Sequence, residues 1–341
     1  MPGARSYLPF FVLLILAAAL LFMLDLSIGS VAIPLKDTLR ILSGSGASEP
    51  AFERIIMVFR LPRVLTALLA GAALAVSGLL MQTLFRNPLA GPYVLGISSG
   101  ASLGVALLVL AGGLLPVMLA TRLSWVVAAA LGAAVVLAAV LLLARTITDT
   151  ATLLIIGLMF GSIAGAVVGI LQYLSRAEAL QAYVFWTFGS LAKVRWQDMP
   201  LFAGTIGGGL LLAFALHKPL NAFALDDKQV QSLGVNIRAA RTAILLATSL
   251  LAGVVTAFCG PVAFIGLAVP HLVRLLVATA RHEVLLPAVA LGGMVVLLFC
   301  DLVAQLPGFD QVLPINIVTA LVGGPVVIWL LISRRNLGKA F

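Results

Sequence analysis

Long stretches without a charged side chain constrain this chain more than any other feature. Residues 6–24, 64–85, 87–121, 123–144, 150–175, 199–217, 242–273, 284–300 and 311–333 contain no Asp, Glu, Lys or Arg. A helix needs about 20 residues to cross the hydrocarbon layer, and an Asp, Lys or Arg at its centre costs about 2.5–3.5 kcal/mol. The runs therefore predict membrane-spanning helices along nearly the whole chain.

Breaks within those runs set the number of helices. Asn87-Pro88 opens a turn, so the next span is expected near Tyr93, and Gly260-Pro261 divides the overlong run 242–273. We expect ten spans, at 8–28, 61–84, 93–113, 122–144, 150–174, 196–217, 240–259, 262–280, 284–306 and 314–333. No segments alternate as a transmembrane β-barrel requires. The expected fold is all-α, a single transmembrane domain over 1–341.

Composition excludes several other classes. Of the 341 residues, 62% are hydrophobic and 10% are charged, against about 25% charged in soluble proteins. The net charge of +9 is scattered between apolar runs, which argues against nucleic acid and for Lys and Arg at membrane lipid headgroups. The run after Arg5 is longer than a signal-peptide core, so we expect a retained span. Cys259 and Cys300 lack metal or redox spacing.

Loop charge predicts the orientation. Ten spans place both termini on one side, and that side carries 12 of the 21 Lys and Arg residues. Because basic loops stay in the cytoplasm, both termini are expected there. The loop at about 29–60 is then extracytoplasmic, and the loop at about 218–241 is cytoplasmic.

A short echo links two of the spans. Leu69-Ala70-Gly71 with Ala75 and Gly78 recurs as Leu251-Ala252-Gly253 with Ala257 and Gly260. Five spans separate the copies, so they cross in opposite directions, as in inverted-repeat transporters. Close helix packing selects the same small residues. A weak inverted repeat and plain packing both remain open.

No catalytic group can be assembled from the sequence. There is no GxxxxGK[ST] loop, and Gly338-Lys339 is followed by alanine, so this chain is not expected to bind or split ATP. His217, His271 and His282 fall at expected cytoplasmic helix ends without carboxylates at ligand spacing. We therefore expect no metal, no cofactor and no enzymatic activity in this chain.

The largest polar loop on the expected cytoplasmic side has apolar residues at helical spacing. The segment 224–235 carries Asp226 and Asp227 and reaches Gly234, which predicts a short amphipathic helix ended by that glycine. It either rests on lipid headgroups or docks a cytoplasmic partner. Acidic residues facing anionic lipid favour docking.

Several motifs, in order along the chain, resemble the FecCD family of ABC permeases. They are Leu61-Pro62-Arg63 after Arg60, Asn87-Pro88-Leu89-Ala90, Leu95-Gly96-Ile97, Leu233-Gly234-Val235, Phe264-Ile265-Gly266, Pro270-His271, Arg274, and Gly324-Pro325 with Trp329. The resemblance covers about 31–335. It implies the permease of a type II ABC importer, working with a second permease subunit, expected to be an identical copy. It also implies two cytoplasmic ATPases, which bind ATP and Mg, and an extracytoplasmic binding protein. The location that it implies is a bacterial inner membrane.

The resemblance also implies residue roles. Arg60 and Arg63 would meet glutamates of the binding protein, whereas the alternative is that they snorkel at the start of a span. The third basic docking residue common in relatives is Gln305 here. The implied ATPase-coupling residues are Asp226, Asp227, Gln231, Ser232, Leu233, Gly234 and Val235. Thr148, Asp149, Thr150, Ala151 and Thr152 resemble the cytoplasmic gate in position and polarity.

The substrate is the least constrained prediction. Members of the family carry ferric siderophores, haem or cobalamin. The segments 172–174 and 185–191 resemble siderophore and haem members more than the cobalamin branch, although an interfacial aromatic belt would have similar residues. We expect ferric siderophore import, with haem or cobalamin as alternatives. An ion-coupled carrier is a distant alternative because it needs mid-span ionisable groups, and Asp301 lies near a helix end.

Overall fold

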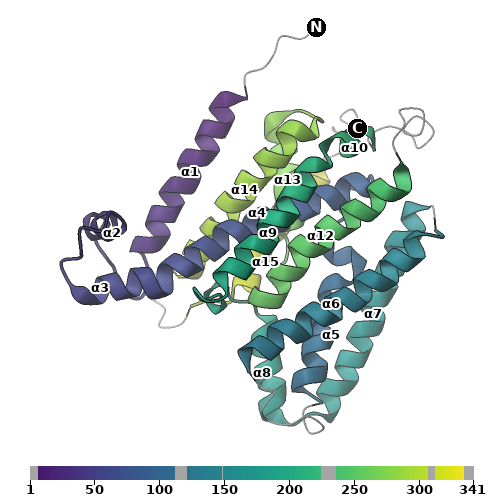
Figure 1. The fold of residues 1–341 in the computed structure, drawn as a ribbon, viewed down its shortest axis with the longest axis horizontal. Coiled ribbons are helices and arrows are strands. Elements are labelled where there is room, and N and C mark those ends of the chain that lie inside the picture. Colours follow the sequence, from purple (N-terminus) through teal and green to yellow (C-terminus); the bar gives the residue numbers. More distant parts are fainter. Residues whose placement is uncertain (1–6, 112–120, 148, 224–235, 306–311, 334–341) are drawn as a thin grey trace.

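The computed structural model describes residues 7–111, 121–147, 149–223, 236–305 and 312–333, and within them every regular element is helical (Figure 1). Each of the ten expected spans is an α-helix. These are α1 (Leu8–Ser27), α4 (Leu61–Leu84), α5 (Ile97–Val109), α6 (Arg122–Ala144), α7 (Thr150–Leu174), α9 (Met199–Ala215), α12 (Ile237–Cys259), α13 (Ile265–Val277), α14 (His282–Ala304) and α15 (Ile315–Ser333). Six of them are long and apolar enough to cross a membrane: α1, α4 together with the helical turns before it, α6, α7, α12 and α14. The other four, α5, α9, α13 and α15, are shorter apolar helices. The all-α prediction is confirmed.

Shorter elements connect the spans. They are α2 (Leu35–Leu42), α3 (Pro50–Arg54), the π-helical η1 (Ile55–Arg60), the 3₁₀ turns η2 (Pro92–Leu95) and η5 (Leu191–Lys193), α8 (Ala177–Thr187) and α10 (His217–Ala222).

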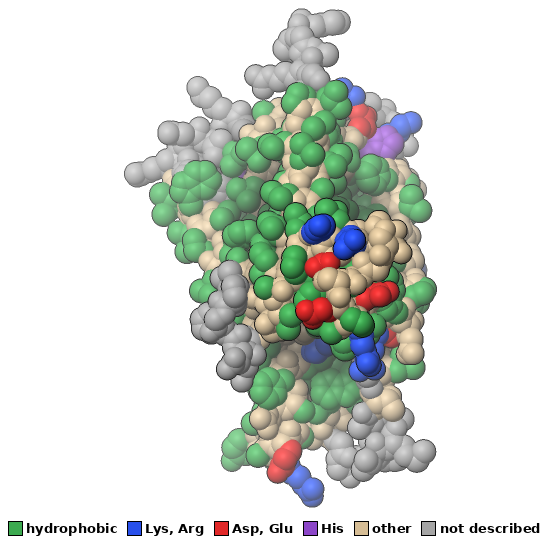
Figure 2. Space-filling view, turned by 90° about the vertical axis from the view of Figure 1, so that its left-hand side faces the viewer, with side chains coloured by type: hydrophobic (Ala, Val, Ile, Leu, Met, Phe, Trp, Pro, Cys, Tyr) green, Lys and Arg blue, Asp and Glu red, His purple; other side chains and the backbone are tan. Residues whose placement is uncertain are grey.

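Helix α4 forms the centre of the bundle. It packs most extensively against α14, and then against α12 and α13. Helices α5, α6 and α7 form a second group with α8 at one edge, while α1 packs on α14 at the opposite edge (Figure 1). Only 17% of the α1 and α7 spans is buried, against 83% for the span that contains α4. Exposed hydrophobic side chains separate small groups of charges on the face shown in Figure 2, as expected of a surface that faces lipid or another subunit.

Side-chain contacts define two ends of the bundle. At one end, which we call the arginine end, Arg63 of α4 pairs with Asp301 of α14. At the other, which we call the histidine end, the His282 ring lies 2.9 Å from Asn221 Oδ1, and Arg86 Nε donates to the backbone of the residue after α10. The loops expected on the cytoplasmic side thus meet at the histidine end.

Helix α4 has the expected bounds, but the segment before it differs from the expectation. Helices α3, η1 and α4 are continuous from Pro50 to Leu84, so the loop expected over 29–60 is largely helical. Pro62 has no N–H to donate to the carbonyl of Val58 and its ring crowds that carbonyl; a wider π turn before it accommodates the ring. The third span begins later than expected, because Gly96 adopts a left-handed conformation (φ 73°) that ends η2 and starts α5.

The two copies of the sequence echo have different structural roles. A Cβ on Gly71 would overlap a backbone oxygen of α14, and one on Gly78 would overlap the backbone oxygen of Gly266 in α13. In α12, a Cβ added to Gly253 would have its nearest neighbouring atom at 4.0 Å, and Gly260 ends the helix with φ 79°. The α4 copy therefore allows close helix approach, a role that the α12 copy does not share.

A junction at the arginine end ties three segments together. The side chain of Asn316 in α15 accepts a hydrogen bond from Ala263 N (3.1 Å), and its backbone N donates to Phe188 O (3.2 Å) after α8. Ser190 N donates to Cys259 O at the end of α12 (2.7 Å). The linker after α8 is thereby held against the α12–α13 connection.

We predict that Gly78→Ala destabilises the bundle because its methyl group would push α13 away from α4. Overpacking of this kind costs about 1–3 kcal/mol. Gly207→Ala in α9 is the matched control, because no atom lies within 4 Å of the added Cβ, and alanine favours a helix over glycine by about 1 kcal/mol. Unfolding of the purified protein in detergent, followed by helicity, measures both; equal stability of the two variants would contradict the prediction.

Candidate functional site

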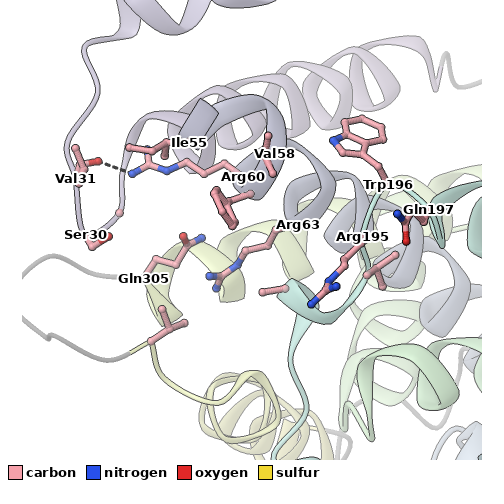
Figure 3. A pocket seen from close by; sticks show the side chains of 15 residues that line it. Ser30, Val31, Ile55, Val58, Arg60, Arg63, Arg195, Trp196, Gln197 and Gln305 are labelled. Atoms are coloured by element: carbon pink, nitrogen blue, oxygen red, sulfur yellow. Dashed lines mark hydrogen bonds between the residues drawn. The ribbon is translucent and has the colours of Figure 1, made fainter. Parts of the chain in front are cut away.

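A cavity among the described residues lies at the arginine end. Its volume is about 780 Å³, and three parts of the chain line most of it: the segment after α1, the η1–α4 region and the linker 192–197 before α9 (Figure 3). Arg60, Arg63 and Arg195 all line it. We call it the arginine cavity.

Arg60 is engaged by the backbone of this chain. Its side chain is buried, with 6% of the residue exposed. Nη1 donates to Leu26 O (2.7 Å), and Nη2 donates to Val31 O in the segment after α1. The guanidinium therefore fixes the segment after α1 against η1, and the expected docking role of Arg60 stays a prediction.

Arg63 forms a buried ion pair between the two most closely packed helices. Its Nε and Nη2 donate to the Asp301 carboxylate at 2.8 and 2.7 Å, and the Asp301 side chain is fully buried. Gln305 Nε2 donates to Asp301 Oδ2 (3.2 Å) and to Asp25 Oδ1 (2.6 Å). The amide at the position where relatives carry a basic residue thus bridges two buried carboxylates and joins α1 to α14.

Sequence reasoning missed Arg195, Trp196 and the role of Asp25. Arg195 is exposed and lines the cavity wall facing η1, and Trp196 Nε1 donates to Met57 O (2.6 Å), which fastens the linker to η1. The one available signal was that Asp25 and Asp301 end apolar runs, because a carboxylate at such a depth requires a partner. Nothing in the sequence identified those partners.

The predicted coupling residues lie outside the described part of the chain. The structure does not describe 224–235, the segment that contains Asp226, Asp227, Gln231, Ser232, Leu233, Gly234 and Val235. Thr148 is not described either. Their expected roles stay predictions.

The other expected gate residues form the start of α7. Asp149 is its N-cap, accepting from Ala151 N (3.4 Å) and from Thr152 N and Oγ1 (2.7 and 2.5 Å). Hydrogen bonds from the Thr152 hydroxyl and N–H hold the pKa of Asp149 below its usual value. Thr150 is the first residue of α7, and Ala151 and Thr152 are exposed. The segment therefore presents a charged cap at the start of a span.

The remaining motif residues shape turns and helix contacts. Asn87 Oδ1 accepts from Leu89 N (2.9 Å) across Pro88, giving the expected turn. Gly96 and Gly266 allow close backbone approach, the latter with Leu74 O only 2.8 Å from where a Cβ would lie.

The motif residues in α13 and α15 have structural positions as well. Pro270 and His271 are buried inside α13, and Arg274 Nη2 lies 3.3 Å from Thr83 Oγ1 of α4. Gly324 and Pro325 lie inside α15.

Comparison with known proteins assigns the chain. The model of the FecCD transport family matches residues 14–333. This chain belongs to the FecCD transport family. It is 37% identical to the hemin transport system permease protein HmuU of Yersinia pestis over 325 residues, which is 95% of this chain and 96% of HmuU. It is 39% identical to the vitamin B12 import system permease protein BtuC of Salmonella typhi over 287 residues, 83% of this chain and 85% of BtuC.

The fold agrees with that family. A solved structure assigned to the metal-chelate type of ABC transporter, in an inward-facing conformation, matches with a TM-score of 0.85 and 30% sequence identity. The match covers 96% of this chain and 100% of the other. This FecCD chain is therefore an ABC importer permease with the type II fold, and the resemblance drawn from the motifs is confirmed.

We predict that removing one partner of the Arg63–Asp301 pair is more damaging than removing both. Asp301→Leu would leave Arg63 uncompensated, and loss of one partner of a buried pair costs about 3–5 kcal/mol. Adding Arg63→Met should recover part of that loss. Unfolding in detergent of the wild type, both single variants and the double variant gives the coupling free energy, and strictly additive losses would show that the pair does not tie α4 to α14.

Proposed function

We propose that this FecCD chain is the permease subunit of an ATP-driven importer of an iron chelate. The observation that carries the proposal is family membership over nearly the whole chain together with a bundle of apolar helices and an open, basic cavity at one end. ATP hydrolysis belongs to a separate subunit in this proposal, because ABC permeases work with ATPase and substrate-binding components.

Two iron chelates are the candidate substrates. Ferric siderophore is the prediction from the segments 172–174 and 185–191. Haem is favoured by the 37% identity to a hemin permease across 95% of this chain. The similarity to BtuC makes cobalamin the third candidate.

The partners follow from the two ends of the bundle. The arginine end faces outward and receives the binding protein, with Arg60 and Arg63 adding to the potential of the docking surface from the cavity floor. The histidine end and both termini face the cytoplasm, where the residues Asp226 to Val235 insert into the ATPase. A second, identical permease copy covers α7, of which only 17% is buried within this chain, and the gate at Thr148 to Thr152 opens toward the cytoplasm between the two copies.

Reconstitution tests the transport function. Proteoliposomes that contain this chain, its ATPase and its binding protein should take up an iron chelate when ATP is supplied to the ATPase side. A ferric siderophore, haem and cobalamin are offered separately, each with a catalytically inactive ATPase as control. Uptake of neither the ferric siderophore nor haem would reject the proposal, and uptake of cobalamin alone would identify the alternative substrate.

The coupling proposal predicts a separation of two activities. Replacing Asp226 to Gly234 by a glycine-serine linker of equal length keeps α10 and α12 connected but removes the predicted docking helix. We expect ATP hydrolysis by the assembled complex to continue while uptake falls to background, because closure of the ATPase would no longer move the spans. Retained uptake would place coupling elsewhere in the chain.

A further inference from the structure

Helix α2 lies at the edge of the bundle and has three different surfaces along its length. The first surface packs on the rest of the protein, because Asp37, Thr38 and Ile41 are buried. The Asp37 carboxylate accepts hydrogen bonds from Ser48 N (3.3 Å) and Ser48 Oγ (2.9 Å). The packed surface is therefore apolar or hydrogen-bonded within the chain, and the other two surfaces face outward.

The second surface is apolar. Leu35, Leu39 and Leu42 are 50%, 53% and 39% exposed. Spacings of four and three residues place them on one side of the helix, and we call them the leucine stripe. Scattered exposed leucines are normal on a protein surface, whereas aligned ones indicate contact with an apolar partner.

The third surface is basic. Lys36 and Arg40 are exposed and lie one helical turn apart. At about 100° per residue, they lie roughly a third of a turn from the leucine stripe, and the packed residues occupy the remaining third. Helices that lie on a membrane surface have this arrangement, because leucines enter the hydrocarbon while the long basic side chains reach back to the headgroups.

The attachment of α2 to α1 fixes its depth. Helix α1 has 20 residues, a length of about 30 Å that matches the hydrocarbon layer, so Ser27 comes to the edge of that layer. Ser27 Oγ lies 3.1 Å from Thr38 Oγ1, and Ile33 N donates to Ser27 O (3.0 Å). Figure 1 shows α2 nearly end-on and α1 from the side, so α2 runs across the end of the span. Both features are those of a helix in the headgroup region.

The surroundings of α2 favour lipid over a protein partner. Helices α1 and α2 stand at the edge opposite the α5, α6 and α7 group (Figure 1), whereas the second permease copy is proposed to cover α7. The arginine cavity, the proposed site of the binding protein, has no lining residue from α2. Leu16 and Leu20 of α1 are 62% and 61% exposed, so the edge next to α2 is a lipid-facing apolar surface.

The contact expected is with individual phosphate groups rather than with a net anionic membrane. The segment 35–54 contains three basic residues, Lys36, Arg40 and Arg54, and three acidic ones, Asp37, Glu49 and Glu53. Its net charge is therefore zero, and only the α2 surface beside the leucine stripe is basic. Zwitterionic and anionic phospholipids both present a phosphate to that surface.

We propose that α2 is a membrane-surface helix that binds phospholipid. The leucine stripe enters the outer part of the acyl-chain layer, and Lys36 and Arg40 contact lipid phosphates. The helix thereby holds the end of α1 at the surface of the bilayer. This inference is independent of the transported substrate and holds for either orientation of the chain.

The test measures the depth of α2 in the full chain reconstituted into phospholipid vesicles. Leu39→Cys carries a fluorophore, which is quenched either by nitroxides on the upper acyl chains of the lipid or by iodide in the water. Ser45→Cys, at an exposed turn after α2, is the matched control, and the wild type, with Cys259 and Cys300 buried, gives the labelling background. Lipid nitroxides should quench the label at 39 about threefold more than the label at 45, and iodide should show the opposite order.

Labels at the other two leucines repeat the measurement. Leu35→Cys and Leu42→Cys should behave as Leu39→Cys does. Equal lipid quenching at all four labelled positions would overturn the proposal. It would also be overturned if the labels on the stripe escaped the lipid nitroxides and were shielded from iodide only when the binding protein of the uptake assay is added, because the stripe would then be a protein-docking surface.

Charge reversal tests the phosphate contact separately. In the chain labelled at 39, Lys36→Glu combined with Arg40→Glu should lower lipid quenching about twofold, since carboxylates are repelled by phosphates. The loss should occur in neutral and in anionic vesicles. Arg54→Glu, an exposed arginine on α3, is the control and should leave the quenching unchanged. Unchanged quenching in the double variant would overturn the assigned phosphate contact.

Discussion

The contact between α4 and α14 is the interaction on which the rest of the bundle depends. In its middle, Gly71 and Gly293 bring the two backbones so close that neither position has room for a Cβ. At the arginine end, Arg63 and Asp301 close the same contact with a bidentate ion pair. In an apolar environment no hydrophobic force pulls helices together, so close packing and buried polar pairs have to hold them. In the described chain, α1, α9, α12, α13 and α15 each pack against α4 or α14.

The same ion pair determines what the arginine end can do. Because Arg63 and Arg60 fasten α14 and α1, they set the shape of the cavity that they line. The linker before α9 reaches that cavity only because Trp196 holds it on η1 and Ser190 holds it on α12. A docking event on this linker would therefore act directly on the junction where α8, α13 and α15 meet.

The sequence predicted the helices well and their partners poorly. Uncharged runs located all ten spans, because the energetic penalty for charge in lipid acts on each segment separately. The segments next to two spans differed from the prediction: a π turn before Pro62 joins a predicted loop to the second span, and Gly96 delays the start of the third helix. The resemblance of the Arg60 and Arg63 motif to a docking segment gave their place at one end, but their hydrogen bonds depend on α1 and α14, which are distant in sequence.

Hydropathy and motif order in the sequence by themselves determined that this chain is a polytopic helical permease of the FecCD family. Those properties are local: each run of residues either tolerates hydrocarbon or does not, and each motif is read in place. Only the tertiary structure decided that Asp25, Asp301 and Gln305 meet beneath the arginines, and that Arg195 lines the same cavity as Arg60 and Arg63. Whether a charge is neutralised or available depends on side chains that the fold brings together from helices far apart in the chain. The spacing of residues along the sequence does not show which of those side chains meet.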